Sequence, residues 1–188
     1  MRLFFAAEFA PPLREAVSDA ITRARIADPP WRWVARENIH ITLKFLGETP
    51  EEVVPELVEA VSGTCALTAP FEIVVGGLGA FPNLQRPRVL FYEVITGARE
   101  LVSLAGAIDA ALFEGLGIPR EDRPFKAHAT VARVKSAIAP ELSARLAKAP
   151  PVERGSQKIE KVTLMESELR PQGALYRPVK SIALTGSK

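Results

Sequence analysis

The chain has 188 residues and a formal net charge of only +2, with 47% hydrophobic and 24% charged residues. This composition is typical of a globular protein, and the length is sufficient to bury a sizeable core. The small net charge excludes a long basic surface for nucleic acid, so any anionic ligand has to be bound locally.

The first half of the chain is predicted to alternate between strands and helices. Its N-terminal apolar run is shorter than a signal-peptide core because Glu8 interrupts it, and we interpret it as a buried strand. Thr49, Pro50 and Glu52 form a capping-box pattern, which predicts the start of a helix. The expected elements are a strand at 2–9, a helix from Pro11 that ends at Asp28-Pro29-Pro30, a strand at about 39–47, a helix after Thr49, and strands at about 71–79 and 88–95.

The second half repeats this order of element types. The expected elements are a helix at 98–114 stopped by Gly115 and Gly117, a strand at about 127–135, a helix after Pro140, and strands near 157–168 and 174–184. The helices that open the two halves start 87 residues apart. We therefore predict an α+β fold in which residues 1–188 form one bilobal domain. Its two pseudo-symmetric lobes would each hold an antiparallel sheet packed on helices, with an active-site cleft between them.

Each half carries one copy of a short histidine motif, His40-Ile41-Thr42-Leu43 and His128-Ala129-Thr130-Val131. These are the only two histidines of the chain, and they lie 88 residues apart. On a strand, successive side chains point to opposite faces, so each histidine shares a face with the threonine two positions later. In the predicted lobes the two motifs would face each other across the cleft.

The paired motifs suit acid and base catalysis at a phosphate. Imidazole titrates near neutral pH, so one histidine can accept a proton from water while the other donates one to a leaving oxygen. The two threonine hydroxyls are uncharged donors that suit phosphate oxygens. A single histidine on a strand is usually structural and threonine is a common strand residue, but two copies at equivalent positions favour a functional centre.

Other site chemistries are poorly supported by the sequence. The histidines have no acidic or thiolate neighbour at ligand spacing, so we expect neither a metal nor a cofactor. Gly76-Gly77-Leu78-Gly79 lacks the lysine of a phosphate-binding loop and the spacing of a dinucleotide site, and we interpret it as a turn or bulge. Cys65, the only cysteine, is expected to be a small buried residue.

On these residues the chain resembles the two-histidine phosphoesterases, and within them the bacterial and archaeal RNA 2′,3′-cyclic phosphodiesterases, historically called 2′-5′ RNA ligases. The paired H-x-T motifs carry the resemblance to the superfamily, and the long block around His40 carries it to this branch. The resemblance covers nearly the full length, and its matches are residues 2–6, 32–34, 37–47, 81–83, 87–90, 123–126, 128–133 and 166–169, with Gly173 and Tyr176.

The resemblance implies an enzyme that opens a terminal 2′,3′-cyclic phosphate to a 2′-phosphate without a metal ion. It implies that His40 is the proton donor to the leaving 3′ oxygen and that His128 is the proton acceptor for water. Thr42, Thr130 and Arg133 would bind the phosphate. A 5′-hydroxyl in place of water would give weak, reversible 2′-5′ ligation. Strict strand alternation places Arg133 on the face opposite His128, so its role requires a bulge or a reach around the strand end.

The expected partner is an RNA with a 2′,3′-cyclic phosphate end, tRNA halves included, or a small cyclic nucleotide. Two alternatives stay open: a phosphodiesterase for a nucleotide or ADP-ribose cyclic phosphate, and a non-catalytic module that binds RNA ends. We expect no membrane association, a cytoplasmic location and a monomer. Candidate phosphate and base contacts, each of which more commonly serves the surface or the core, are Arg120, Arg123, Lys126, Lys135, Trp31, Trp33, Phe81 and Tyr176.

Overall fold

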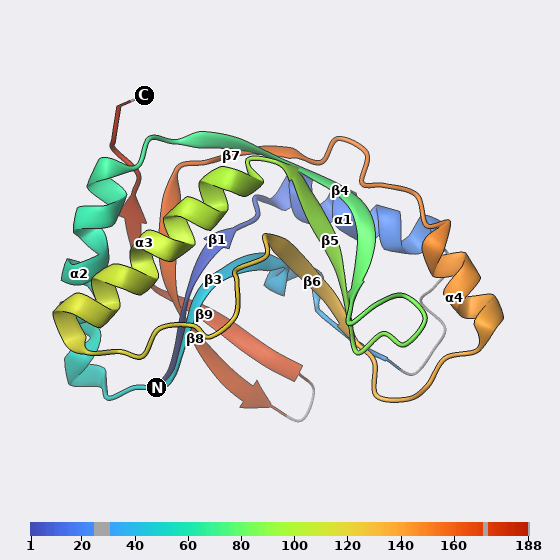
Figure 1. The fold of residues 1–188 in the computed structure, drawn as a ribbon, viewed down its shortest axis with the longest axis horizontal. Helices are drawn as coiled ribbons and strands as arrows, with labels where there is room; N and C mark the ends of the chain where they lie inside the picture. Colours follow the sequence, from blue (N-terminus) through green and yellow to red (C-terminus); the bar gives the residue numbers. More distant parts are fainter. Residues whose placement is uncertain (25–30, 171–172, 188) are drawn as a thin grey trace.

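Two antiparallel sheets with helices outside them make up the fold of residues 1–24, 31–170 and 173–187, the part of the chain that the computed structural model describes (Figure 1). The first sheet has the order β3-β1-β8-β9, with β3 (His40–Glu48), β1 (Arg2–Glu8), β8 (Lys161–Arg170) and β9 (Gly173–Ala183). The second sheet has the order β2-β6-β5-β4-β7, with β2 (Arg32–Trp33), β6 (His128–Arg133), β5 (Val89–Thr96), β4 (Phe71–Phe81) and β7 (Ser156–Ile159). The predicted α+β class, with one motif strand in each antiparallel sheet, is confirmed.

Each sheet combines strands from both halves of the sequence. The first half contributes β4 and β5 to the sheet that holds the second motif strand, β6. The second half contributes β8 and β9 to the sheet that holds the first motif strand, β3. β1 lies inside the first sheet, where it pairs antiparallel with both β3 and β8. The two lobes therefore do not coincide with the two halves of the chain, because each half completes the other's sheet.

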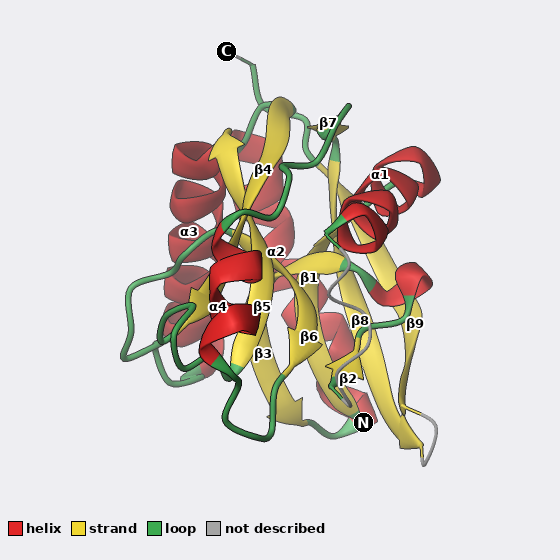
Figure 2. Ribbon diagram, turned by 90° about the vertical axis from the view of Figure 1, so that its right-hand side faces the viewer, coloured by secondary structure: helices red, strands yellow, loops and turns green. Residues whose placement is uncertain are grey.

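The helices lie outside the two sheets (Figure 2). They are α1 (Pro11–Arg23), α2 (Val54–Leu67), α3 (Ala98–Leu116) and α4 (Pro140–Ala147), with the 3₁₀ turns η1 (Arg36–Asn38) and η2 (Glu51–Val53). α2 packs against α3, and the two contact the first sheet through β8, β9 and β3. α3 continues through Gly115, which the sequence predicts to end it, and stops at Gly117 in the left-handed conformation at φ +66°. Among the described helices, none combines the length and the apolar character that crossing a bilayer requires.

One apolar core joins the two sheets, and it explains why the motif side chains point away from it. Ile41 and Ala129 are buried in this core, and each lies between the histidine and the threonine of its motif. Strand alternation therefore turns the histidines and threonines to the opposite face of their sheets. Cys65 is also fully buried in the core, which confirms its expected place, and burial raises the pKa of its thiol to about 11.

Two predicted boundaries in the described chain are wrong. The expected strand at 157–168 is two strands, β7 and β8, which belong to different sheets, so the chain changes sheets at Glu160. Both strands bury apolar residues, and the sequence pattern alone does not separate them. Thr49 does not cap a helix because it still pairs with β1: its N–H donates to the Met1 carbonyl, and its hydroxyl donates to the Gly47 carbonyl. A 3₁₀ turn, η2, precedes α2 instead.

Two further expectations concern glycines and prolines. The glycine-rich segment at 76–79 lies within β4, and the pairing of β4 with β5 shifts register between Val75 and Leu78. The predicted bulge is therefore confirmed. α1 ends at Arg23, and the predicted stop at Asp28-Pro29-Pro30 lies outside the described residues.

Candidate active site

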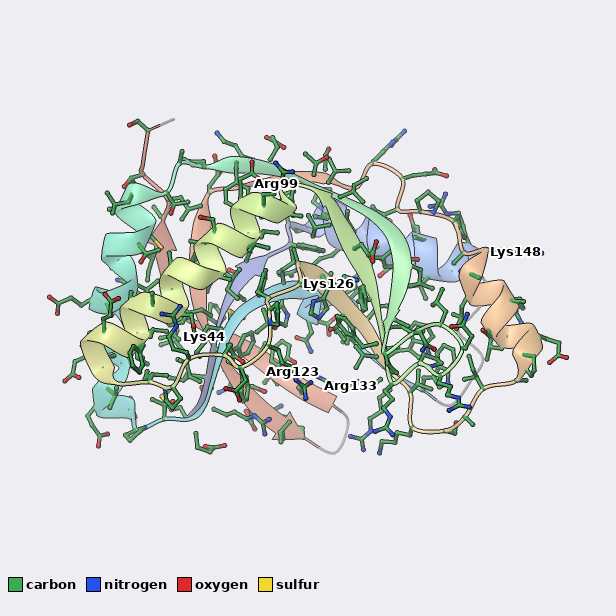
Figure 3. The ribbon with its side chains drawn as sticks, in the orientation of Figure 1. Lys44, Arg99, Arg123, Lys126, Arg133 and Lys148 are labelled. Carbon is green, nitrogen blue, oxygen red and sulfur yellow. The ribbon has the colours of Figure 1, made fainter. Side chains whose placement is uncertain are left out.

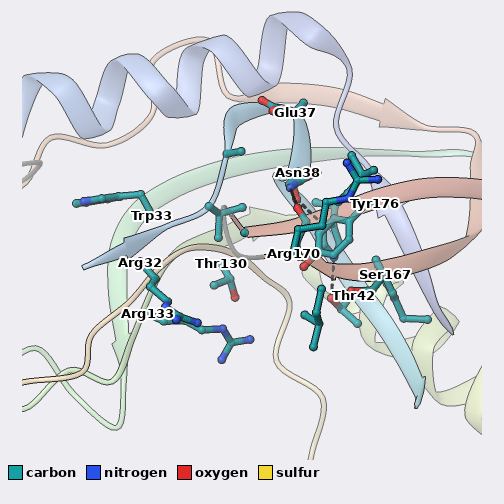
Figure 4. Close-up of a pocket in the computed structure, with 18 of the residues that line it drawn as sticks. Arg32, Trp33, Glu37, Asn38, Thr42, Thr130, Arg133, Ser167, Arg170 and Tyr176 are labelled. Carbon is teal, nitrogen blue, oxygen red and sulfur yellow. Dashed lines mark hydrogen bonds between the residues drawn. The ribbon is translucent and has the colours of Figure 1, made fainter. Parts of the chain in front are cut away.

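A cleft of about 840 Å³ opens between the two sheets, and it brings the predicted site residues together (Figure 4). His40 and Thr42 line it from β3, and His128, Thr130 and Arg133 line it from β6. Every residue that the sequence analysis assigns to catalysis or phosphate binding therefore reaches the same cavity. The two motif strands, β3 and β6, also contact each other, so the two motifs lie on neighbouring strands of the cavity wall.

Matching bulges in the two motif strands set which side chains face this cleft. In β3, Leu43 is extra, because Ala6 and Phe5 of β1 pair with Thr42 and Lys44. In β6, Val131 is extra, because Phe91 and Leu90 of β5 pair with Thr130 and Ala132. Each bulge lies three residues after its histidine and shifts the alternation by one position.

The bulges bring one more residue from each motif strand into the cleft, Phe45 from β3 and Arg133 from β6. These two residues are 88 positions apart, like the two histidines. Strict alternation would have pointed Arg133 away from His128, and the bulge at Val131 is what reverses its direction. The condition that the sequence analysis placed on Arg133 is therefore met.

Both imidazoles are held in the same orientation by the backbone. Nδ1 of His40 donates to the carbonyl of Asn38 at 2.6 Å, and Nδ1 of His128 donates to the carbonyl of Lys126 at 2.6 Å. Because Nδ1 carries the proton, Nε2 is the nitrogen that accepts or donates a proton in the cleft. Nε2 of His40 lies 2.9 Å from the Thr42 hydroxyl, which donates to it when the ring is neutral.

Aromatic rings pack around both histidines and change their acidity. His40 contacts Phe4 and Tyr176, with ring centroids 5.0 and 5.2 Å away, and His128 contacts Phe81 and Phe91, each at 5.1 Å. Burial lowers the pKa of both histidines below the ordinary value and outweighs their bonds to backbone carbonyls. Both rings are therefore neutral near pH 7 in the free protein. An anion bound between them would raise both pKa values again.

Two charged groups near His40 act in opposite directions on its pKa. Glu8 pairs with His40 across β1 and β3, and its carboxylate accepts a hydrogen bond from the Thr163 hydroxyl at 2.6 Å. Arg14 lies 3.8 Å from the same carboxylate. After burial, Glu8 raises and Arg14 lowers the pKa of His40. The sequence analysis missed Glu8, because its proximity depends on the register of two strands that are far apart in the chain.

A buried ion pair lies on the other side of the first motif strand. Lys44, labelled in Figure 3, is only 3% exposed. Its Nζ donates to Asp109 Oδ1 at 2.7 Å and to the Pro119 carbonyl at 2.8 Å. Burial alone would raise the pKa of Asp109, but hydrogen bonds from Lys44 and Arg120 outweigh it and hold that pKa below its ordinary value. The pair ties β3 and α3 to the segment that leads into His128.

The cations expected around the second motif mostly serve other purposes. Arg120 binds Asp109, and Lys126 binds Glu93 at 3.0 Å and lies over the Phe91 ring. Of the five cations named from the sequence, Arg133 is the one that lines the cleft, while Arg123 and Lys135 are not part of its lining. Nearby carboxylates bind Arg120 and Lys126, so these two have the more common surface role rather than a place in the cleft.

The four aromatic candidates also divide between core and cleft. Trp31 is buried in the core, and Phe81 packs on His128. Trp33 and Tyr176 line the cleft. Within the described ranges, no three His, Cys, Asp or Glu side chains come together as a potential metal site.

The chain is similar to known proteins in both sequence and fold. A family model described as LigT-like phosphoesterase matches residues 8–91 and 96–176. An RNA 2′,3′-cyclic phosphodiesterase of Thermus thermophilus is 37% identical over 99% of this chain and 91% of its own, and one of Aquifex aeolicus is 34% identical over 82% of each. The crystal structure of TT0787 of Thermus thermophilus matches all of this chain and all of its own with a TM-score of 0.81 and 33% identity. That of E. coli LigT complexed with 3′-AMP covers 98% of each chain with a TM-score of 0.78 and 28% identity.

Proposed function

The chain belongs to the LigT-like phosphoesterase family, and from this premise we propose that it hydrolyses the 2′,3′-cyclic phosphate at the end of an RNA to a 2′-phosphate. The observation that carries the proposal is the pair of imidazoles that line one cleft, each with Nδ1 bonded to a backbone carbonyl and Nε2 left for proton transfer. We also infer that residues 1–188 act as one bilobal domain, since a single apolar core joins the two sheets.

In the proposed reaction a water molecule attacks phosphorus while the bond to the ribose 3′ oxygen breaks. Nε2 of neutral His128 accepts the proton of the water, and protonated His40 donates a proton from Nε2 to the leaving 3′ oxygen. Among the described residues, no protein group hydrogen-bonds Nε2 of His128, which leaves that nitrogen to the water. His40 takes the role of the acid once the bound phosphate raises its pKa, which burial lowers in the free protein.

The threonines would stabilise the charge that develops on the phosphate. In the free protein the Thr42 hydroxyl donates to Nε2 of His40. Once His40 is protonated, Nε2 no longer accepts, and the hydroxyl of Thr42 turns to donate to a phosphoryl oxygen. Thr130 occupies the equivalent position beside His128. Such donors act best on the charge of the transition state.

The experiment compares His40→Ala and His128→Ala with the native protein on an oligonucleotide that ends in a 2′,3′-cyclic phosphate. Each histidine should contribute about 10²–10⁴-fold to the rate, so both variants should lose nearly all turnover while keeping the native circular dichroism spectrum. Arg86→Ala is the control, because Arg86 is exposed and does not line the cleft. Near-native turnover in both histidine variants, or a 3′-phosphate product, would contradict the proposal.

Two finer points of the mechanism are part of the same proposal. Because two imidazoles supply both the acid and the base, a chelator should leave the rate unchanged, and a requirement for added metal would count against the mechanism.

A 5′-hydroxyl in place of water would reverse the reaction and give a weak 2′-5′ ligation. A small cyclic nucleotide is the alternative substrate, and a direct comparison of its kcat/KM with that of the oligonucleotide separates the two.

A further inference from the structure

Two arginines stand directly opposite each other at one end of the cleft. Arg32 on β2 pairs with Arg133 on β6, and both line the cavity. Figure 4 shows the two side chains extending side by side, on one side of Thr130. Like charges directly opposite each other on an antiparallel pair are unfavourable, and an anion bound between them would offset the repulsion.

No carboxylate of the described chain neutralises this arginine pair. The ion pairs found in residues 1–24, 31–170 and 173–187 include neither Arg32 nor Arg133. At another part of the cleft wall, Arg170 makes two hydrogen bonds to Glu168, at 2.9 and 3.0 Å. Arg2, the other lining arginine outside these ion pairs, lies over the Phe45 ring, so Arg32 and Arg133 are the two that face each other without a carboxylate.

The charge of the whole cleft exceeds what the reacting group can offset. Of the described residues that line the cavity, four are arginines and one, Glu37, carries a carboxylate. A 2′,3′-cyclic phosphate is a cyclic diester with a single negative charge. A substrate that also carries an internucleotide phosphate brings a second charge into the same cavity.

The position of the pair separates it from the reacting phosphate. Arg133 lies beyond Thr130 when counted from His128. Because of the bulge at Val131 the two residues pair with Val89 and Phe91, two positions apart on β5, which is about 7 Å along the strand. The bulge at Val131 turns the Arg133 side chain to the cleft face, opposite Arg32. The threonine hydroxyl and the arginine pair thus form two successive anion positions along one strand.

We propose that Arg32 and Arg133 bind a second phosphate of the substrate strand, the internucleotide phosphodiester next to the reacting cyclic phosphate. This inference rests on the proposed function and names its substrate class: an oligonucleotide end rather than a mononucleoside cyclic phosphate. Arg32, which the sequence analysis noted only within a run of matching residues, is then a residue that determines specificity. A guanidinium suits this role because its fork of N–H groups contacts two phosphate oxygens at once.

The test uses two dinucleotides that end in a 2′,3′-cyclic phosphate and differ only in the internucleotide linkage. One linkage is the ordinary charged phosphodiester, and the other is an uncharged methylphosphonate. The native protein should have a kcat/KM about tenfold or more higher for the charged linkage, the range that a hydrogen bond to a charged group provides. In Arg32→Met, which keeps Arg133, this ratio should fall severalfold, and Arg86→Met, which changes a matched exposed arginine outside the cleft, should keep the native ratio.

The outcomes separate this inference from the function on which it rests. A native ratio near one, or an Arg32→Met variant that loses the same factor on both linkages, would overturn it, because Arg32 would then act on the reacting phosphate or on the fold. If neither dinucleotide is hydrolysed, the proposed function fails. The inference is then decided by calorimetric Kd values for the two dinucleotides. A tenfold preference for the charged linkage that falls severalfold in Arg32→Met would support it, and equal affinities of the native protein would overturn it.

Discussion

Replacing Lys44 by methionine should destabilise the protein far more than removing an ordinary surface lysine. Lys44 is 3% exposed, and its ammonium makes a 2.7 Å hydrogen bond to Asp109, a 2.8 Å bond to the Pro119 carbonyl and a 3.4 Å ion pair with Glu121. Methionine keeps most of the length of the side chain and removes the charge. Asp109 would then keep Arg120 and a backbone N–H of Glu121 as partners, but lose its most buried one.

Removing one partner of a buried ion pair typically costs about 3–5 kcal/mol, because the other charge stays buried. The partners that Asp109 retains place the expected loss at the lower end, about 3 kcal/mol, which is roughly a hundredfold in the unfolding equilibrium. Lys158→Met is the matched control, since Lys158 is 52% exposed and contacts Glu160 at 3.4 Å. An exposed pair of this kind contributes less than about 1 kcal/mol.

The assay is urea unfolding at pH 7, followed by circular dichroism, for the native protein and both variants. A second series at lower pH tests the cause. The pKa of Asp109 is lower in the folded protein than its ordinary value of 3.8, so the stabilisation is present above that value and is lost as the pH falls through the lowered pKa. The difference between native protein and Lys44→Met should therefore shrink in acid. A loss for Lys44→Met no larger than that for Lys158→Met would refute the reasoning.

Two further predictions concern the histidines and the cysteine. Because burial lowers the pKa of His40 and His128, kcat/KM, which reports on the free enzyme, should peak below pH 6.5. The bound phosphate raises both pKa values, so kcat should peak at a higher pH. A kcat/KM maximum above about pH 7 would contradict this prediction. Cys65 is fully buried, so a thiol reagent should label it only as fast as the protein unfolds, and rapid labelling of the native protein would argue against its placement.

The sequence could predict which motif residues share a face because those signals are local. A histidine and a threonine two positions apart share a face on any strand, and Ile41 and Ala129 between them mark the buried side. The second half of the chain also repeats the order of element types of the first half, so the two motif strands could be placed in corresponding sheets. These inferences need only the spacing of residues that are close in the chain.

The parts that could not be predicted depend on pairing between distant strands. The bulge that turns Arg133 to the cleft is visible only once β6 is aligned with β5, and the pairing of Arg32 with Arg133 requires the register of β2. In the sequence Lys44 is one more charged residue after the first motif. Its ion pair becomes apparent only in the fold, where Asp109 of α3 lies next to it. The break between β7 and β8 is hidden because their apolar patterns are alike and their partners, β4 and β1, lie far apart in the chain.

The exchange of strands between the two halves has a consequence for how the chain reaches its folded state. One edge of β1 stays open until β8, more than 150 residues further along the chain, has been synthesised. Such distant pairing raises the contact order and slows folding, because the loop has to close before the contacts can form. A ribosome-bound chain that ends before β8 would therefore expose an unpaired hydrophobic strand edge, the kind of surface that chaperones bind.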